Sequence, residues 1–440
     1  MRSFLLPFLA TASGVAASRY VIYFDQYHTA SLPTKEVTAG ITHVITAFAS
    51  STLFTTDPVG DYQPFMNVTQ VRALFDRGTK VCMAIGGWGD TDGFSKGAAD
   101  EASRKLYAKN IAVTVKRLGY DCVDVDWEYP GGNGDDYRKN PNSNKTSEIE
   151  TFPLLLAEIK KAIPCKELSI AVPGREEDMI AYTAEQVPKI NAAVDYINVM
   201  TYDLMNRRDN FTKHHTPIQG SLETVKTYIS RGMTPSKMNM GLAFYAKWFM
   251  TAKGATCTSP VGCPTELLEA ADGTDTGKSG AMTFEAANFA PVPTNLTETT
   301  DGTCGAGTYS KCKASDCCGQ YGFCGTEVGH CGTGCQSGFG RCEGVSTKDS
   351  FKKALANAEY DSTNGGEWYW DAEGGIFWTW DTPSIIQAKF DQIIGPQRLG
   401  GAMAWSLAED SEDWSHLLAM QAAVKNRHTH GKHRRRHDMP

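Results

Sequence analysis

The segment Asp121-Cys122-Val123-Asp124-Val125-Asp126-Trp127-Glu128-Tyr129 decides the fold, because its acidic and apolar residues alternate one by one. Alternate side chains of a β-strand lie on the same face, so Asp124, Asp126 and Glu128 should share one face and the two valines the other. The valines and the neighbouring Trp127 argue against a solvated edge strand. We therefore expect a strand that lies between a layer of helices and the interior of a barrel.

Short apolar, β-branched segments recur along the whole chain and predict eight strands. They are Tyr20–Phe24, His43–Ala49, Lys80–Ile85, Cys122–Asp126, Leu168–Val172, Tyr196–Tyr202, Met238–Phe244 and Gly401–Ser406. Most are separated by amphipathic stretches that predict helices, such as Arg104–Leu118, Glu148–Ile163 and Ser221–Arg231. Eight strands that alternate with helices predict an α/β fold, a (β/α)8 TIM barrel, rather than an open sheet.

The spacing breaks once, between the seventh and eighth predicted strands, which are separated by about 155 residues, far more than a βα unit needs. Two aromatic-rich segments in this interval, Gly366–Trp370 and Gly375–Trp380, predict strands of a small α+β subdomain, and a cysteine-dense block lies within it. We therefore expect a nested chain. The barrel would comprise 18–249 and 381–424, the α+β insertion 250–302 and 344–380, and a small disulfide-rich module 303–343.

Composition and the N-terminal segment limit the function classes. The 440 residues suffice for a large barrel with a smaller module, and the net charge of −7 argues against a nucleic-acid binder. Residues 1–17 combine a basic start, an apolar run and small residues, which predicts a signal peptide. No later apolar run is long enough to span a bilayer. We expect a soluble, secreted protein of the extracellular space or cell wall.

One further sequence feature fits an exported protein. Four Asn-x-Ser/Thr sequons, at Asn67, Asn144, Asn210 and Asn295, are compatible with glycosylation.

The tail 425–440 is rich in Lys, Arg and His, and we expect it to be disordered and solvated. Adhesion to anionic wall polymers, metal binding and trimming by a protease that cuts after basic pairs are the alternatives for the tail.

Three carboxyl groups on one face of a strand have a chemical consequence. Like charges this close cannot all ionise, so at least one pKa should rise and a proton should be shared. Glu128 lies at the carboxyl end of the strand, where barrel enzymes place their chemistry, and a carboxylic acid that stays protonated near neutral pH can protonate a leaving group. The alternatives are a solvated acidic edge and a site for calcium or magnesium, for which carboxylates are good ligands.

Four separated motifs, in the expected order, resemble those of the glycoside hydrolase family 18 chitinases over most of residues 19–425. Cys122–Glu128 is similar to the family's catalytic strand, and Ala84-Ile85-Gly86-Gly87-Trp88 resembles its S-x-G-G strand. Met200-Thr201-Tyr202-Asp203 matches the M-x-Y-D element, and Ala404-Trp405-Ser406 resembles the eighth strand. The resemblance implies a retaining, substrate-assisted mechanism through an oxazolinium intermediate, which requires no cofactor and no metal.

The resemblance also implies the catalytic roles. Glu128 would donate a proton to the scissile oxygen while the substrate's 2-acetamido carbonyl attacks the anomeric carbon. Asp126 would turn to bind the acetamido N–H, Asp124 would share its proton, and Tyr202 would donate a hydrogen bond to the acetamido oxygen. The family usually has Ser where this chain has Ala84. A hydroxyl near Asp124 is therefore missing, which puts the tuning of the carboxylate relay in doubt.

The other motif residues are expected to bind the substrate. Trp405 would stack beneath the sugar, because aromatic rings suit the apolar faces of pyranoses. The remaining members of this set are Tyr23, Phe48, Gly87, Trp88, Met200 and Asp203. Ordinary core packing is the alternative for each aromatic residue.

Eight of the thirteen cysteines lie in a Gly-rich segment from Cys304 to Cys342. The segment has too few aliphatic residues for an adequate core, so it must be held covalently. Zinc would favour paired C-x-x-C knuckles, which do not occur in this segment, and an exported protein favours disulfides. Spacing alone does not choose among the many connectivities.

Within this segment, Cys317-Cys318-Gly319-Gln320-Tyr321-Gly322-Phe323-Cys324-Gly325 resembles the hevein-like chitin-binding module. The resemblance implies the pairs Cys304–Cys318, Cys312–Cys324, Cys317–Cys331 and Cys335–Cys342. It also implies sugar-binding positions at Gly319, Tyr321, Phe323 and His330. That family usually has Ser at the first of these positions and an aromatic residue at the last, which would weaken binding. A purely structural knot is the alternative.

The five remaining cysteines are scattered. Cys82 and Cys122 should face the barrel interior on adjacent strands, where a disulfide or simple packing is possible, and we expect packing. Cys257 and Cys263 lie in one Gly/Pro/Ser loop and are expected to form a disulfide. Cys165 has no evident partner and is the candidate for the thiol that an odd total leaves free.

The leading hypothesis is a monomer that hydrolyses the β-1,4 linkages of chitin and chito-oligosaccharides. One alternative is an endo-β-N-acetylglucosaminidase that cuts the cores of N-glycans, and another is a catalytically weak chitin lectin. The insertion and the module favour chitin, because a walled groove and a polymer anchor suit long linear chains. The presence of Glu128 argues against the lectin, unless the change at Ala84 inactivates the relay.

Overall fold

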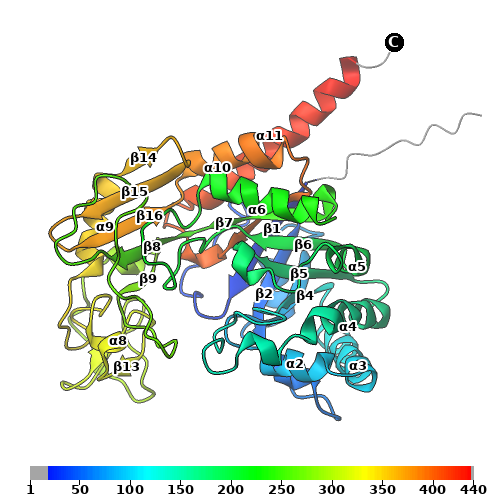
Figure 1. The fold of residues 1–440 in the computed structure, drawn as a ribbon, viewed down its shortest axis with the longest axis horizontal. Coiled ribbons are helices and arrows are strands. Elements are labelled where there is room, and N and C mark those ends of the chain that lie inside the picture. The colour runs from blue at the N-terminus through cyan, green and yellow to red at the C-terminus, as the bar shows by residue number, and fades with distance from the viewer. Residues whose placement is uncertain (1–17, 438–440) are drawn as a thin grey trace, which may run out of the picture.

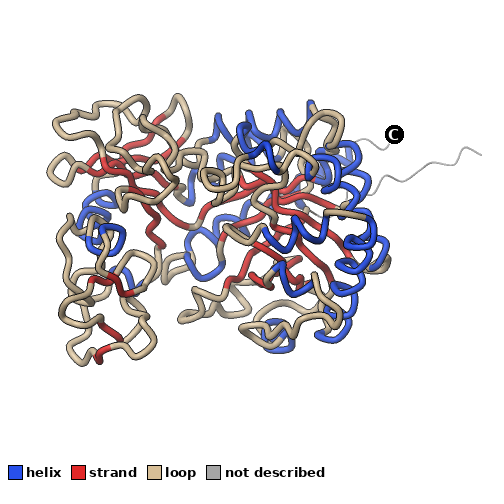
Figure 2. Tube along the Cα trace, turned by 60° about the horizontal axis from the view of Figure 1, so that its bottom comes forward, coloured by secondary structure: helices blue, strands red, loops and turns tan. Residues whose placement is uncertain are grey.

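The eight predicted strands form a closed parallel barrel in the computed structural model, which describes residues 18–437 (Figures 1 and 2). They are β1 (Arg19–Asp25), β2 (His43–Ala49), β3 (Lys80–Gly86), β4 (Cys122–Asp126), β5 (Glu167–Pro173), β6 (Tyr196–Met200), β7 (Met238–Ala243) and β17 (Gly401–Trp405). Around the barrel the order is β1-β17-β7-β6-β5-β4-β3-β2. The predicted (β/α)8 barrel is therefore confirmed, whereas the predicted signal peptide, 1–17, lies outside the described residues.

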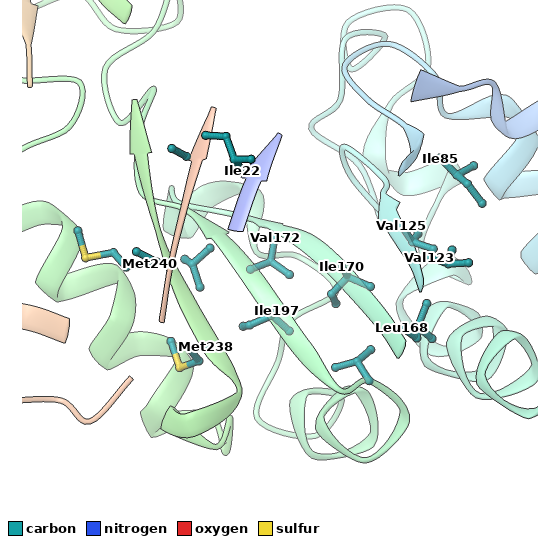
Figure 3. Packing of buried hydrophobic residues seen from close by; sticks show 14 of the residues in the cluster. Ile22, Ile85, Val123, Val125, Leu168, Ile170, Val172, Ile197, Met238 and Met240 are labelled. Carbon is teal, nitrogen blue, oxygen red and sulfur yellow. The ribbon is translucent and has the colours of Figure 1, made fainter. Parts of the chain in front are cut away.

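Helices surround the barrel and bury the outward-facing side chains of its strands. They are α1 (Val68–Ala73), α2 (Asp92–Ala98), α3 (Glu101–Leu118), α4 (Glu148–Ala162), α5 (Val187–Ala193), α6 (Ile218–Ser230), α10 (Pro383–Lys389) and α11 (Ser415–His437). Val123 and Val125 of β4, which Figure 3 labels, belong to the same core as Leu155 and Ile159 of α4. The outward face of β4 is thus apolar, as the alternation of its residues predicts.

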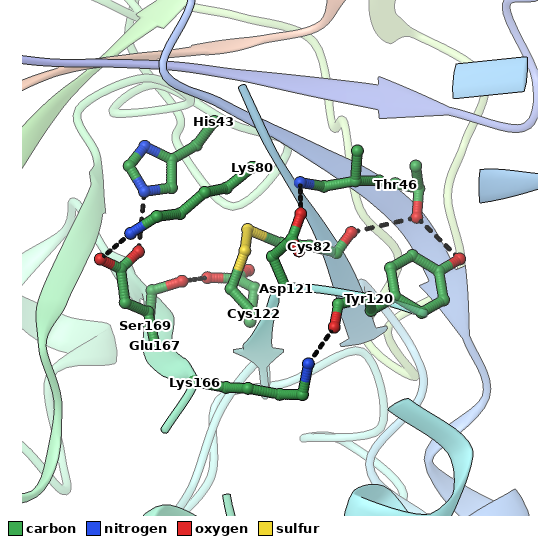
Figure 4. Close-up of a disulfide and its surroundings, with 12 residues drawn as sticks. His43, Thr46, Lys80, Cys82, Tyr120, Asp121, Cys122, Lys166, Glu167 and Ser169 are labelled. Carbon is green, nitrogen blue, oxygen red and sulfur yellow. Dashed lines mark hydrogen bonds and ion pairs between the residues drawn. A yellow bond between two sulfur atoms is a disulfide. The ribbon is translucent and has the colours of Figure 1, made fainter. Parts of the chain in front are cut away.

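The barrel interior differs from the prediction at one point, because Cys82 and Cys122 form a disulfide instead of packing as free thiols (Figure 4). The register of β3 and β4 places the two residues directly opposite each other, with their Cα atoms 4.4 Å apart. This separation lies within the range that a disulfide can bridge. The expectation of packing was wrong because the pairing register could not be read from either strand alone.

The long interval between β7 and β17 forms a second sheet with the order β14-β15-β16-β8-β9. Its strands are β8 (Tyr245–Met250), β9 (Ser279–Thr283), β14 (Glu359–Asp361), β15 (Gly366–Asp371) and β16 (Ile376–Trp380), and its helices are α7 (Ala286–Phe289) and α9 (Thr347–Ala356). The insertion begins at Tyr245 rather than at residue 250, because β8 pairs with β9 and β16 and not with a barrel strand. Phe351 of α9 stacks on Trp378 of β16 with ring centroids 4.6 Å apart, which joins the helix to the sheet.

The cysteine-dense module contains only short elements, β11 (Ser310–Lys311), β12 (Cys317–Cys318), β13 (Cys324–Gly325) and α8 (Val328–Cys331). Its β11 pairs with β10 (Thr297–Glu298), which precedes the module. Its disulfides are the four pairs implied by the hevein-like resemblance, Cys304–Cys318, Cys312–Cys324, Cys317–Cys331 and Cys335–Cys342. Cys257 and Cys263 are also bonded. Cys165 is a free, exposed cysteine.

The basic tail differs from the expectation of disorder, because α11 continues through Lys425 to His437. From Ser415 to His437 the segment contains no proline, and many of its residues have a high helix propensity. No helix among the described residues has the length and apolarity to cross a membrane. The four sequon asparagines, Asn67, Asn144, Asn210 and Asn295, are all exposed.

Candidate active site

The alternation along β4 directs its acidic residues into the barrel, where Asp124 is fully buried and well bonded. Its carboxylate accepts hydrogen bonds from the Tyr23 hydroxyl at 2.6 Å, from Ser169 Oγ at 2.5 Å and from Asn198 Nδ2 at 3.2 Å. Burial raises the pKa of Asp124, and the hydrogen bonds from Ser169, Tyr23 and Asn198 oppose that rise. Asp124 is therefore held in place by side chains from three other barrel strands, β1, β5 and β6.

Above Asp124 lie Asp126, the last residue of β4, and Glu128, which follows the strand. Asp126 is 3% exposed, and its Oδ1 has no hydrogen-bond partner within residues 18–437. Burial, together with the carboxylates of Glu128 and Asp124, raises the pKa of Asp126 well above its ordinary value. Burial is also the main cause that raises the pKa of Glu128 to about 7, so this carboxyl group holds a proton near neutral pH.

The hydroxyl that Ala84 lacks is supplied from the other side of β4. The register pairs Asp124 with Ala84 on β3 and with Ser169 on β5. Ser169 is fully buried, and its hydroxyl donates to Asp124 Oδ1. Neither Ser169 nor Asn198 was predicted, since a single polar residue in an apolar strand gives no signal until the strand's neighbours are known.

The predicted aromatic residues lie together, but only some of them face the cleft. Trp405 stacks on Phe48 with ring centroids 5.6 Å apart and an angle of 17° between the planes. Trp88 is 49% exposed, and the Arg208 guanidinium carbon lies 5.8 Å from its ring centroid. Tyr23 is 1% exposed and lines neither cavity of the cleft, and its role beneath the sugar stays a prediction. Its ring packs on Trp405, and its hydroxyl donates to Asp124.

Two glycines allow the backbone after β3 to approach the site closely. A Cβ atom on Gly86 would lie 2.2 Å from the carbonyl oxygen of Asp126, and one on Gly87 would lie 2.8 Å from the ring of Phe48. Both glycines have positive φ angles, and the Gly87 N–H donates to the Asp126 carbonyl at 2.9 Å. Any side chain at these positions would push β3 away from the carboxylates.

The motif after β6 contributes Met200, Tyr202 and Asp203. The Tyr202 hydroxyl lies 3.8 Å from the sulfur of Met403, and Asp203 accepts hydrogen bonds from the Tyr245 hydroxyl at 2.9 Å and from Lys247 Nζ at 3.3 Å. Burial alone would raise the pKa of Asp203, but the positive charge of Lys247 and the hydrogen bonds outweigh burial and hold that pKa below its ordinary value. Asp203 is therefore a fixed negative charge beside the acid.

Two adjoining cavities, of about 250 and about 610 Å³, form a cleft at the carboxyl ends of the barrel strands. The residues that line both cavities are Trp88, Glu128, Met200, Tyr202, Asp203, Lys247 and Tyr321. Phe48, Gly87, Asp126 and Trp405 line the larger cavity only. The cleft residues that were not predicted include Tyr27, Arg175, Asp178, Arg207, Arg208, Tyr245, Lys247, Asp275 and Glu409. They lie on loops and on the insertion, where no periodic pattern marks them.

Two groups of side chains within residues 18–437 have the spacing of metal ligands. The first consists of Cys304, Cys312 and Cys318, whose sulfurs are all in disulfides. In the second, His28 Nδ1 lies 2.9 Å from Asp25 Oδ1 and 3.7 Å from Glu409 Oε1. Burial alone would lower the pKa of His28, but these carboxylates outweigh it and raise that pKa to about 9. A positively charged imidazole between carboxylates accounts for the second group.

Three of the four predicted sugar-binding positions of the module, Gly319, Tyr321 and Phe323, lie in the turn between β12 and β13, where Gly319 is buried, and His330 lies on α8. Tyr321 is 68% and Phe323 54% exposed. His330 is half-buried, and its ring packs against Gly319 and Gly325. Only Tyr321 of these residues also lines the cleft of the barrel.

Comparisons with known proteins agree with this geometry. The profile of the family described as glycosyl hydrolases family 18 matches residues 19–410. Chitinase 1 of Aphanocladium album is 26% identical over 284 residues, which cover 55% of this chain and 62% of that protein. Chitotriosidase-1 of Mus musculus is 26% identical over 278 residues, which cover 56% of this chain and 57% of that protein. The chain thus spans about three fifths of the length of each.

Among solved structures, the catalytic domain 2 of the group II chitinase from Ostrinia furnacalis is similar to this chain, with a TM-score of 0.65 and 20% sequence identity. The match covers 93% of this chain and 97% of that domain. At this identity the likeness establishes the shared fold.

Proposed function

The chain belongs to family 18 of the glycosyl hydrolases, and from this premise we propose that it cleaves the β-1,4 linkages between N-acetylglucosamine units of chitin and chito-oligosaccharides. The observation that carries the proposal is the stack of Asp124, Asp126 and Glu128 at the floor of the cleft. Its outermost member lines both cavities and has a pKa of about 7. An acid with that pKa can protonate a leaving group at neutral pH.

In the mechanism that we propose, Glu128 gives its proton to the scissile oxygen, and the 2-acetamido oxygen of the substrate attacks the anomeric carbon to form an oxazolinium ion with net retention. Asp126 turns toward the acetamido N–H, since its Oδ1 has no competing partner among the described residues. Asp124 and Asp126 share one proton between their carboxyl groups. Tyr202 donates to the acetamido oxygen, and Trp405 stacks beneath the sugar.

The hydrogen bonds of Asp124 argue for an active barrel rather than a lectin. The lectin alternative depends on the loss of a hydroxyl at Ala84, but Ser169 donates to the same carboxylate from the opposite strand. When one neighbouring hydroxyl takes the place of another, the buried carboxylate of Asp124 keeps a hydrogen bond that stabilises its charge. We therefore propose hydrolysis as the function.

We also propose that the protein is exported, acts as a monomer and binds chitin through the module 303–343. The six disulfides within residues 18–437 support export, because such bonds persist in oxidising compartments. The exposed rings of Tyr321 and Phe323 support binding of sugar rings by the module. None of these proposals requires a cofactor.

The deciding experiment uses the parent protein and its Glu128→Gln variant with chito-oligosaccharides and with a high-mannose glycopeptide. We expect the parent to cleave the oligosaccharides with retention at the anomeric carbon, and the variant, which keeps the shape of the acid but has no proton to donate, to be inactive. Cleavage of the glycopeptide alone would instead indicate an endo-β-N-acetylglucosaminidase. Binding of the oligosaccharides without any cleavage would indicate a lectin.

A further inference from the structure

The aromatic ring of Tyr321 belongs to the module but lies in the catalytic cleft. It is one of the residues that line both cavities, together with Glu128, Tyr202 and Asp203 of the barrel. Phe323, two residues away and also exposed, lines neither cavity. Of the three exposed aromatic residues of the module, Tyr309, Tyr321 and Phe323, only Tyr321 thus lies where the acid lies, which a remote anchor would not require.

The module is packed against the insertion in a fixed position. Gln320 Nε2 donates to the carbonyl oxygen of Ser279 at 3.2 Å, and Ser279 itself lines the smaller cavity. The backbones approach each other so closely that a Cβ atom on Gly277 would lie 3.0 Å from the Cα of Gly329. Gly334 lies against Trp248, a side chain of the insertion that is fully buried. These contacts fix Gln320, the residue next to Tyr321, against β9, whose residue Ser279 lines the smaller cavity.

Charged groups of the cleft surround Tyr321. Its side chain is 68% exposed, so a ligand in the cleft can reach the ring. The charged groups near it are Asp275, Arg207 and Asp203, all of which line the smaller cavity. An accessible aromatic face beside carboxylates and a guanidinium group can stack on a pyranose ring while hydroxyl groups of the sugar are hydrogen-bonded.

We propose that Tyr321 forms a sugar-binding subsite of the catalytic cleft, so that the module and the barrel hold the same substrate chain during cleavage. This inference rests on the proposed function, which supplies N-acetylglucosamine chains as the ligand. It differs from anchoring, because a subsite in the cleft affects soluble oligosaccharides as well as insoluble chitin.

The test compares Tyr321→Ala with Tyr309→Ala, a tyrosine of the same module that is 66% exposed and lines neither cavity, and with Tyr321→Phe, which keeps the ring. For a soluble hexamer of N-acetylglucosamine we expect Tyr321→Ala to lower kcat/KM about tenfold, equivalent to about 1.4 kcal/mol. Tyr321→Phe and Tyr309→Ala should remain within about twofold of the parent. Thermal melting shows whether each variant folds.

The inference is overturned if Tyr321→Ala cleaves the soluble hexamer as well as the parent does, or if Tyr309→Ala is impaired to the same extent. If the parent does not cleave the hexamer at all, the proposed function fails, and calorimetric binding of the hexamer to the same four proteins then decides the inference. Weaker binding by Tyr321→Ala alone supports the subsite. Equal binding by all four proteins, or no binding by the parent, refutes it.

Discussion

Replacing Ser169 by Ala is the sharpest test of the carboxylate relay. The substitution removes one hydroxyl from a fully buried position and leaves a cavity of about one oxygen atom, so packing changes little. The hydrogen bond that disappears joins Ser169 Oγ to Asp124 Oδ1 over 2.5 Å. Tyr23 and Asn198 keep their hydrogen bonds to the same carboxylate. The variant therefore isolates the contribution of a single hydroxyl.

The expected magnitude follows from the charge of the acceptor. A hydrogen bond to a charged group contributes about 1.5–3 kcal/mol, and its loss in a dry site is not made good by water. Burial already raises the pKa of Asp124 and the bond from Ser169 opposes that rise, so the variant should have a still higher pKa at Asp124. If proton sharing with Asp126 limits the rate, kcat should fall about tenfold to about a hundredfold.

The assay measures kcat for a soluble chito-oligosaccharide with Ser169→Ala, with Ala84→Ser and with the double variant. Because Ala84 and Ser169 flank Asp124 in the register, the serine on β3 should restore most of the lost rate. A Ser169→Ala protein that folds and keeps the parent's kcat would refute the reasoning. A double variant no better than Ser169→Ala would show that the hydroxyl on β5 serves something other than Asp124.

Three further outcomes can be checked. Above pH 7, kcat should fall about tenfold per pH unit as Glu128, whose pKa is raised to about 7, loses its proton, and a flat profile to pH 9 would contradict this. Replacing Cys82 and Cys122 by Ala should lower the free energy of unfolding in urea by about 2–4 kcal/mol, and an unchanged value would mean that the bond constrains nothing. A hydrogen bond from His43 is the first cause that lowers the pKa of Glu167 from 4.5 to about 2, so Glu167 stabilises the fold above pH 4.5 and ceases to do so as the pH falls through 2. At pH 7, Glu167→Gln should therefore lower the free energy of unfolding by about 1 kcal/mol and melt at a lower temperature than the parent. At pH 2 the two proteins should melt alike.

The barrel could be predicted because its strands are buried on both faces and each carries its own local signal. The alternation from Asp124 to Glu128 gave the direction of the side chains, and the eight-fold repeat gave the architecture. The insertion was found from spacing alone, although its first strand, β8, was assigned to the barrel up to residue 249 because it follows β7 almost without a break.

What could not be predicted depends on contacts between distant strands. The resemblance implied that Tyr23 supports the sugar, but the hydrogen bond from its hydroxyl to Asp124 depends on how β1 and β4 lie in the barrel. Ser169 has no motif around it, and its role exists only because β5 pairs with β4 in one register. The same is true of the bond between Cys82 and Cys122.

The closure of the barrel between β1 and β17 also fixes when the protein can finish folding. Arg19 pairs with Gly401, so the first strand leaves the ribosome long before its second neighbour exists. At ordinary rates of synthesis the interval is roughly 20 to 80 s, during which one edge of β1 has no partner. The insertion and its module, whose disulfides join cysteines only 7 to 14 residues apart, can be complete within that time. Closure of the barrel by β17 then follows the folding of the insertion. Until closure, the unpaired edge of β1 is the surface to which chaperones or other unfolded chains would bind.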